Sequence, residues 1–385
     1  MDFRLRKRLA VAAVLLASGL AFGLRVRNRM VDFTVNYTAG ERIRGGETLY
    51  RAEDGHYQFK YSPYCAMIYL PLSCLPLSAA KGLWFALVLG ATAAMIILTR
   101  RLLGPSPPPA SWTASVLPPF ILAKYIVREI DLGQINAVVT AVLLAMAVLL
   151  AEDEAARNPG KSAAAGFLWG TAVSMKPYAV IFLPYFFYKR KWNALWPGLF
   201  ILAASFLIPA VFYGFPGNLA VHLEWIESLS KSTAALLTSQ DNVSLLAFFM
   251  KWTRNVDLAR LAYGGTVIVL SLAVLVFIRR GRGRPGTLPA ESGLLLLAIP
   301  LVSPLGWDYT FLASLPAVAL VVSRFRDFPV PVRAVLGLNF AVIGLSLYDF
   351  LGRGPYAAFM NASVLTLDFL LVGAALFHLR MARKI

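Results

Sequence analysis

Asp32 is the acidic residue that follows the first long apolar stretch of the sequence. The segment after it, Phe33–Tyr37, begins and ends with an aromatic residue. A carboxylate at the edge of a membrane can act as a general base that deprotonates a hydroxyl group. It can also be a helix-end carboxylate that forms an ion pair with Arg27 or Arg29. Its position at the first turn outside the membrane favours the catalytic interpretation.

Lys176 lies between two short apolar segments and directly before Pro177. Because proline interrupts helical hydrogen bonding, we expect the chain to break there. Residues 163–188 then form two short helices or one long kinked helix; two helices keep the basic residues Lys189–Lys191 on the cytoplasmic side and are favoured. A lysine at such a break can bind a phosphate group as a point charge, or its amine can simply extend to the membrane interface.

Arg128 belongs to a polar turn, 128–136, that separates two apolar stretches. Its guanidinium can bind a phosphate, or the neighbouring Glu129 and Asp131 can neutralise it. Gln134 and Asn136 supply amide groups that suit sugar hydroxyls or a phosphate, although an ordinary turn is the more common reason for such a pattern. The sequence leaves these alternatives open.

Two later turns combine amide, acidic and aromatic side chains. Asp241 and Asn242 either contact a ligand or cap the helix that follows. Trp307 beside Asp308 suits stacking against a sugar, and an interfacial aromatic anchor is the other explanation. We therefore predict a site in which Asp32 is catalytic and the following side chains bind phosphate or sugar: Tyr37, Tyr61, Arg128, Gln134, Asn136, Lys176, Asn242, Trp307 and Asp308.

The composition indicates the environment that must hold these residues. The chain has 385 residues, of which 58% are hydrophobic and 15% charged, whereas soluble domains carry about 25% charged residues. The formal net charge is +17, but the basic residues form short clusters between apolar stretches, as the positive-inside rule expects of a polytopic membrane protein. Because no aromatic residues accompany these clusters in a basic groove, we expect no nucleic-acid partner.

Hydrophobic stretches of about 20 residues can cross the membrane as helices. Tracing them predicts an all-α fold with about twelve transmembrane helices of unequal length, both termini in the cytoplasm, and a retained first helix from about Leu9 to Met30. We expect the chain to form one integral membrane domain, 1–385. Its external segments are 31–80, which includes interfacial helices, and 212–257. Short helices that end at one level predict a cavity at the outer face, because charged groups at membrane depth normally face a cavity or a partner.

The sequence predicts neither a metal site nor a cofactor. The three histidines, His56, His222 and His378, lack metal-ligand spacing. No phosphate-binding loop, dinucleotide fingerprint or nucleophile elbow is present. The cysteines, Cys65 and Cys74, lie in an apolar stretch and are interpreted as packing residues.

Several segments resemble, in the same order, those of glycosyltransferase family 87, a family of bacterial membrane enzymes of the GT-C type. The first is VDFTVNYTAGERIRGGETLY (31–50), which FKYSPYCAMIYLPLSCLP (59–76) follows. Later segments are DLGQIN (131–136), MKP (175–177), QDNVSL (240–245) and SPLGWDY (303–309). Each motif is short, but their order covers most of the chain.

The resemblance implies a location in the bacterial plasma membrane and an activity. Such enzymes transfer a hexose, mannose in the best-known members, from a polyprenyl-phosphate donor to a lipid or glycan acceptor at the outer face, with inversion and without a nucleotide. Asp32 matches the catalytic aspartate of the family, and Lys176 matches a lysine near the donor phosphate. Relatives often have a histidine shortly after the tryptophan of the late motif, whereas Asp308 and Tyr309 follow Trp307 in this chain.

Two alternatives differ from this expectation. A polytopic transporter or lipid flippase would show internal repeats and binding groups near the bilayer midplane; here the two halves do not match and the polar groups collect on one side. A retaining transferase would need a second carboxylate close to the first. Asp241 or Asp308 could supply it, and the sequence leaves that mechanism open.

Overall fold

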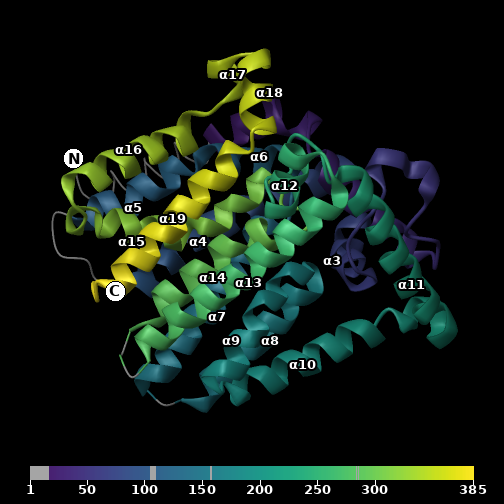
Figure 1. The fold of residues 1–385 in the computed structure, drawn as a ribbon. Helices are drawn as coiled ribbons and strands as arrows, with labels where there is room; N and C mark the ends of the chain where they lie inside the picture. The colour runs from purple at the N-terminus through teal and green to yellow at the C-terminus, as the bar shows by residue number, and fades with distance from the viewer. Residues whose placement is uncertain (1–16, 105–109, 157, 283, 285) are drawn as a thin grey trace, which may run out of the picture.

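The computed structural model of the chain describes residues 17–104, 110–156, 158–282, 284 and 286–385. Every element named within these ranges is an α-helix or a short 3-10 helix, and the strand-like pairing found there is one isolated bridge between Asn242 and Trp307. Figure 1 shows many of these helices packed side by side, with α10 (Trp192–Leu207) and α11 (Ala210–Leu236) along one edge of the molecule. The predicted all-α class is therefore confirmed. Much of the predicted first helix lies outside the described residues.

Among the described residues, four helices are long and apolar enough to cross a membrane: α4 (Leu77–Leu103), α7 (Asn136–Ala156), α13 (Val256–Gly281) and α19 (Val364–Met381). A fifth span results if α10 (Trp192–Leu207) and α11 (Ala210–Leu236), which are bent by 90° at their junction, are counted together. The predicted number of about twelve is not confirmed. Several apolar stretches instead form shorter helices, namely α14 (Leu288–Val302), α15 (Leu315–Ser323) and α16 (Val330–Leu345).

The chain breaks at Lys176, as Pro177 predicted. α8 (Pro159–Met175) ends there, and the lysine backbone is extended, with φ −139° and ψ 108°. The short 3-10 helix η3 (Pro177–Ile181) and α9 (Phe182–Lys189) follow. Of the two alternatives, the structure therefore contains two helices, and Lys176 lies at their junction.

The first external segment is folded rather than loop-like. It contains α2 (Val31–Arg44), the 3-10 helix η2 (Ala52–Tyr57) and α3 (Pro63–Ser73). Both terminal guanidinium nitrogens of Arg42, Nη1 and Nη2, donate to the carboxylate of Asp54, which holds η2 against α2 and lowers the pKa of Asp54. Ser62 caps α3 by accepting from the backbone N–H of Cys65, and its hydroxyl donates to the carbonyl of Ser174 at 2.7 Å. The segment is thereby fastened beside the end of α8.

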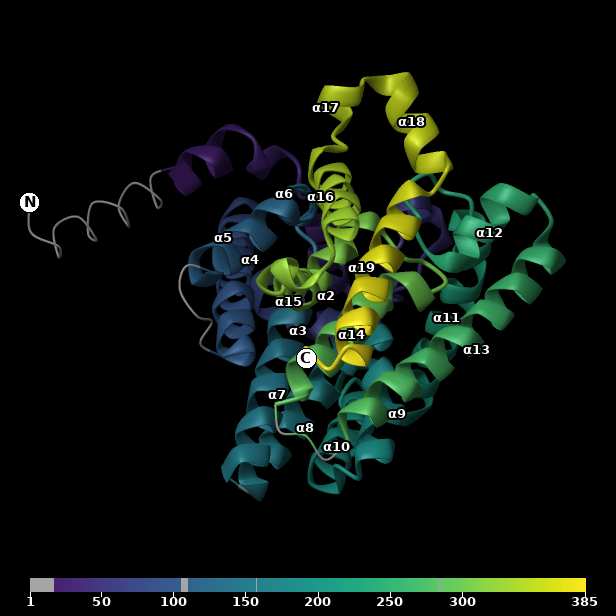
Figure 2. The ribbon, with the colours of Figure 1, turned by 60° about the vertical axis from the view of Figure 1, so that its left-hand side comes forward.

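The centre of the protein is formed by the 3-10 helix η4 (Asp308–Ser314) and by α15. Every side chain from Asp308 to Val322 is buried. α15 packs against α14, α19 and α5 (Ala110–Ile121), and η4 packs against α6 (Ala123–Leu132). Figure 2 shows α15 between α5 and α19. The remaining elements lie around this centre: η1 (Val26–Asn28), α12 (Leu245–Thr253), η5 (Phe325–Asp327), α17 (Tyr348–Leu351) and α18 (Arg353–Asn361).

Helices α8 and α10 approach closely because glycines line their contact. A Cβ atom on Gly166 would lie 2.0 Å from the carbonyl oxygen of Ala194, and one on Gly170 would lie 2.5 Å from that of Gly198. Small residues at such contacts allow membrane helices to pack backbone to backbone. This contact supports the helix that ends at Lys176.

We predict that Gly170→Ala destabilises the protein, because the added methyl group meets backbone that cannot move freely. Overpacking of this kind costs about 1–3 kcal/mol. The matched control is Gly264→Ala in α13, where an added Cβ meets nothing within 4 Å. The midpoint of thermal unfolding in detergent should fall for Gly170→Ala and stay unchanged or rise for Gly264→Ala. Equal midpoints would contradict the close packing.

Candidate functional site

The start of α2 docks on the end of α6 and thereby places Asp32. The backbone N–H of Met30 donates to the carbonyl of Asp131 at 2.8 Å. Gly133 ends α6 with a positive φ of 69°, and a Cβ there would lie 2.6 Å from Cβ of Phe33, so the position requires glycine. Trp84 fixes this turn by donating to the carbonyl of Gly133 at 2.8 Å. The first turn of α2 consequently faces the polar turn after α6.

Four predicted site residues form one hydrogen-bonded chain, which we call the Asp32–Lys176 chain. The Lys176 amine donates to the Tyr61 hydroxyl at 3.0 Å, and that hydroxyl donates to Oε1 of Gln134 at 3.0 Å. The Gln134 amide then donates to Oδ2 of Asp32 at 2.7 Å. All three bonds point towards the carboxylate, so the chain connects a buried cation to an anion. Burial raises the pKa of Tyr61 well above its usual value, which keeps its hydroxyl protonated as a donor.

The carboxylate of Asp32 is half-buried and retains one free oxygen. Within the described ranges, Oδ1 has no hydrogen-bond partner and Asp32 forms no ion pair. Arg29 instead pairs with Asp131 at 3.1 Å, together with Arg25 at 2.9 Å. The alternative in which Arg27 or Arg29 neutralises Asp32 is therefore wrong.

Glu129 is a site residue that the sequence did not single out. It is fully buried, and its carboxylate accepts from the side-chain amide of Asn136 and from the backbone N–H of Ala137, each at 2.8 Å. Burial raises the pKa of Glu129 to about 7, against the opposing effect of these bonds. Tyr178 donates to Oδ1 of Asn136 at 3.1 Å. The sequence signal that could have found Glu129 is its place shortly before the start of the next helix, α7, because a carboxylate is favoured near a helix N-terminus.

Arg128 forms ion pairs with two carboxylates that are distant in sequence. Its guanidinium lies 2.7 Å from Asp241 and 2.8 Å from Asp308. It also lies 5.7 Å from the ring centre of Tyr309. The alternative in which Glu129 and Asp131 neutralise Arg128 is wrong, since both are engaged elsewhere. We call Arg128, Asp241 and Asp308 the arginine triad.

Asn242 joins the two late turns to each other. Its side-chain oxygen accepts from the backbone N–H groups of Ser244 and Gly306, each at 3.1 Å, and its amide donates to the carbonyl of Pro304. Ser244, not Asn242, caps α12 by accepting from the N–H of Ala247. The turn thus holds Trp307 in place, and its ring lies parallel to that of Tyr309 at 6.4 Å.

Tyr37 is engaged away from the Asp32–Lys176 chain, since its hydroxyl donates to the carbonyl of Leu75 at 2.8 Å. In this structure Tyr37 and Asn242 serve the architecture around the site. The binding roles predicted for both remain predictions.

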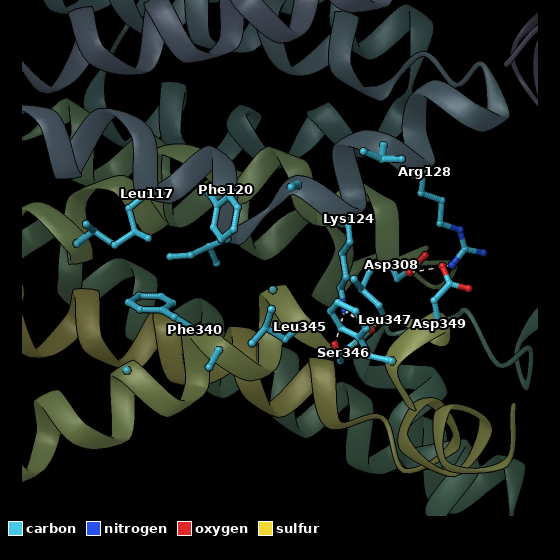
Figure 3. A pocket seen from close by; sticks show the side chains of 18 of the residues that line it. Leu117, Phe120, Lys124, Arg128, Asp308, Phe340, Leu345, Ser346, Leu347 and Asp349 are labelled. Atoms are coloured by element: carbon cyan, nitrogen blue, oxygen red, sulfur yellow. Dashed lines mark hydrogen bonds and ion pairs between the residues drawn. The ribbon is translucent and has the colours of Figure 1, made fainter. Parts of the chain in front are cut away.

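A cavity of about 1300 Å³ reaches the arginine triad from the side of α5 and α16. Figure 3 shows apolar side chains, including Leu117, Phe120 and Phe340, along its length, with Lys124 farther along and Arg128 and Asp308 beyond the lysine. Of the predicted site residues, Arg128 and Asp308 therefore border a space with an apolar region and a polar end.

Comparison with known proteins identifies relatives. The model of "Glycosyltransferase family 87" matches residues 59–304, which include Tyr61, Gln134 and Lys176 but not Asp32. A protein of Mycolicibacterium smegmatis described as a polyprenol-phosphate-mannose-dependent alpha-(1-2)-phosphatidylinositol mannoside mannosyltransferase is 28% identical over an alignment of 347 residues. The match covers 79% of this chain and 73% of that protein. The crystal structure of ArnT from Cupriavidus metallidurans in the apo state is 14% identical, covers 98% of this chain and 78% of its own, and has a TM-score of 0.42.

The match to the family model extends over more than half of the chain, and the long apolar helices give the chain the multi-pass membrane character that the sequence predicted. The transporter and flippase alternative is set aside on this ground. The chain belongs to glycosyltransferase family 87 and is a membrane glycosyltransferase.

Proposed function

We propose that this protein transfers a hexose from a polyprenyl-phosphate donor to a hydroxyl group of a lipid or glycan acceptor at the outer face of the membrane, with inversion. The name of the Mycolicibacterium relative supports this class of donor and makes mannose the first sugar to test. The observation that carries the proposal is the Asp32–Lys176 chain, because it joins a carboxylate with a free oxygen to a buried cation.

In this mechanism Asp32 is the general base. Gln134 holds Oδ2, which leaves Oδ1 to accept the proton of the acceptor hydroxyl. The hydroxyl oxygen then forms a bond to the anomeric carbon while the bond from that carbon to the phosphate oxygen breaks. The phosphate leaves with the electron pair, and the proton remains on Asp32. Attack from the side opposite the phosphate inverts the anomeric centre.

The departing phosphate needs positive charge, and two lysines lie near Asp32. The Lys176 amine donates to one described partner, Tyr61, so two of its three N–H donors remain for a phosphate. Lys60 is half-buried, and Asp32 lies near enough to attract its amine. Because a buried cation without an anion is costly, a phosphate at Lys176 would stabilise both partners. Polyprenyl phosphate brings its own leaving group, so the proposal includes no metal and no cofactor.

The inverting mechanism also agrees with the place of the other carboxylates. Asp241 and Asp308 form ion pairs with Arg128, and Glu129 accepts hydrogen bonds from Asn136 and Ala137. Neither arrangement presents a second carboxylate in contact with Asp32, as a retaining double displacement would need. Asp32 is therefore proposed as a base rather than as one of two catalytic carboxylates.

We predict that Asp32→Asn lowers the turnover number at least a hundredfold, because a positioned general base contributes about 10²–10⁴-fold. Asparagine keeps the size of the side chain and an oxygen for the Gln134 amide, so the fold should be retained. The assay follows transfer of labelled hexose from a polyprenyl-phosphate donor in lipid. Glu41→Gln, at an exposed carboxylate of the same helix, is the control that should keep its activity. Wild-type turnover by a folded Asp32→Asn protein would refute the base assignment.

We also predict that Lys176→Met raises KM for the donor and lowers kcat, roughly tenfold in total, because a charged hydrogen bond to the phosphate is lost. KM for the acceptor should not change. Lys161→Met, at the other end of α8 where the lysine pairs with Glu152, is the control. If Lys176→Met changed KM for the acceptor alone, Lys176 would not be the phosphate-binding residue.

A further inference from the structure

Glu129 is a fully buried carboxylate that takes no part in the transfer steps described above. Its Oε1 accepts from the backbone N–H of Ala137 and its Oε2 from the side-chain amide of Asn136, each at 2.8 Å. Among the described residues it forms no ion pair and donates no hydrogen bond. Both oxygens therefore act as acceptors, as those of an ionised carboxylate do. A charged group is costly to bury, so these contacts must matter to the fold or to the reaction.

Glu129 determines which way the Asn136 amide points. Because an ionised carboxylate offers only acceptors, Asn136 presents its nitrogen to Glu129 and its oxygen to the opposite side. That oxygen accepts from the Tyr178 hydroxyl at 3.1 Å. The same nitrogen also donates to Oε1 of Gln134, over a longer distance of 3.4 Å. The orientation set at Glu129 is thereby passed on to Gln134.

Gln134 receives donors on its oxygen from two sides. Oε1 accepts from the Tyr61 hydroxyl at 3.0 Å as well as from Asn136. The Lys176 amine can only donate, so the Tyr61 oxygen accepts from it and the Tyr61 hydrogen is left for Gln134. With its oxygen placed in this way, Gln134 turns its nitrogen to Asp32, in the 2.7 Å bond to Oδ2. A buried cation and a buried anion thus fix the same amide from two sides.

We propose that Glu129 is a positioning residue of the transfer reaction. Through Asn136 it fixes the orientation of Gln134, and Gln134 in turn holds the base. In this orientation an N–H group faces Oδ2 of Asp32 and Oδ1 stays free for the acceptor hydroxyl, whereas a reversed amide would set its oxygen against the carboxylate. The inference rests on the proposed function, because it depends on Asp32 being the base. Glu129 does not touch the reacting atoms and acts through two amides.

Two simpler roles for Glu129 lead to different expectations. Its bond to Ala137 lies at the start of α7, and a purely structural carboxylate would affect only the stability of the fold. Its charge also attracts the buried amine of Lys176. A carboxylate that only balanced this charge would affect KM for the donor, because Lys176 is the proposed phosphate-binding residue. Control of the Gln134 orientation affects kcat instead, because it is the base that is disturbed.

The first variant, Glu129→Gln, keeps the size of the side chain but offers one oxygen to two donors. Since the backbone N–H of Ala137 cannot reverse, the new amide nitrogen faces Asn136 and turns that amide round. The Asn136 oxygen then meets Oε1 of Gln134, so Gln134 reverses and sets its oxygen against Asp32. We expect kcat to fall roughly 10- to 100-fold, as for a lost hydrogen bond to a charged group. KM for the donor and KM for the acceptor should not change.

A double variant, Glu129→Gln with Asn136→Asp, separates orientation from stability. The new amide donates to the new carboxylate, which also accepts from the Tyr178 hydroxyl, so one buried charge and its hydrogen bonds are restored. An acceptor nevertheless faces Gln134, whose amide stays reversed. The midpoint of thermal unfolding should therefore return towards the wild-type value while kcat remains low. This variant also carries the test if Glu129→Gln alone does not fold.

A Gln134→Met background tests the route by which Glu129 acts. Methionine leaves no amide to reverse, so adding Glu129→Gln should lower kcat no further than Gln134→Met does alone. Two independent effects would multiply instead. A further fall as large as that in the wild-type background would show that Glu129 acts by another route and would overturn the inference.

The pH dependence of kcat gives an independent readout. Burial raises the pKa of Glu129 to about 7, and the carboxyl group is ionised above this value and protonated below it. Because the protonated group cannot accept from both donors, kcat of the wild type should fall as the pH decreases through about 7. Glu129→Gln, which cannot titrate, should lack this step. The titratable groups that respond to the charge of Glu129 are the same in both proteins: Tyr61, Tyr69, Lys176, Tyr178 and Tyr309.

Glu291→Gln is the matched control, and all rates refer to folded protein isolated by size-exclusion chromatography. Glu291 is also buried and accepts from Tyr185 and Lys189, each at 2.8 Å. It lies in the first turn of α14, whereas the 303–309 turn follows the other end of that helix. Its replacement should lower the midpoint of thermal unfolding and leave kcat and its pH dependence unchanged.

Three further results would overturn the inference. Wild-type kcat in folded Glu129→Gln would show that the carboxylate does not position the base. A rise in KM for the donor in place of a fall in kcat would assign Glu129 to the charge of Lys176. Recovery of kcat in the double variant would make its role structural. Each result counts against the inference alone when Asp32→Asn is inactive, whereas an active, folded Asp32→Asn would refute the proposed base itself.

Discussion

The Asp32–Lys176 chain is the interaction on which the proposed reaction depends. Its residues come from four separate segments, at the start of α2, before α3, after α6 and after α8. The helix break at Lys176, the positive φ of Gly133 and the cap formed by Ser62 bring these segments together. Each of the three is a local feature of the chain. The lysine is buried and the carboxylate is half-buried, so the chain also links two charges that would each be costly alone. The hydrogen bonds that join these segments therefore also position the proposed base and the proposed phosphate-binding lysine.

Local chemistry made part of this site predictable. Pro177 marked the break at Lys176, and the polar turns at 128–136 and 303–309 interrupted apolar stretches clearly enough to be recognised. The number of spans stays a prediction, because apolar stretches that look alike in sequence form long helices or short ones according to where they pack. The helix α2 was not assigned, since its polar, β-branched and glycine residues show no apolar periodicity.

Partners distant in sequence explain the remaining differences. Arg128 was compared with its neighbours Glu129 and Asp131, but its partners lie more than 100 positions away. Lys124 escaped notice because a single lysine at the end of an apolar stretch resembles one that extends to the membrane interface. Its contact with Ser346 and its place in the lining of the cavity are visible only in the structure.

The assignment of Asp32 as a base is tested most directly by the configuration of the product. The anomeric centre of the transferred hexose can be determined by NMR and compared with that of the polyprenyl-phosphate donor. With Asp32 as the base of a single displacement, the account predicts the inverted anomer as the product of wild-type turnover. A retained anomer would show a different mechanism and would contradict the single displacement in which Asp32 is proposed to act.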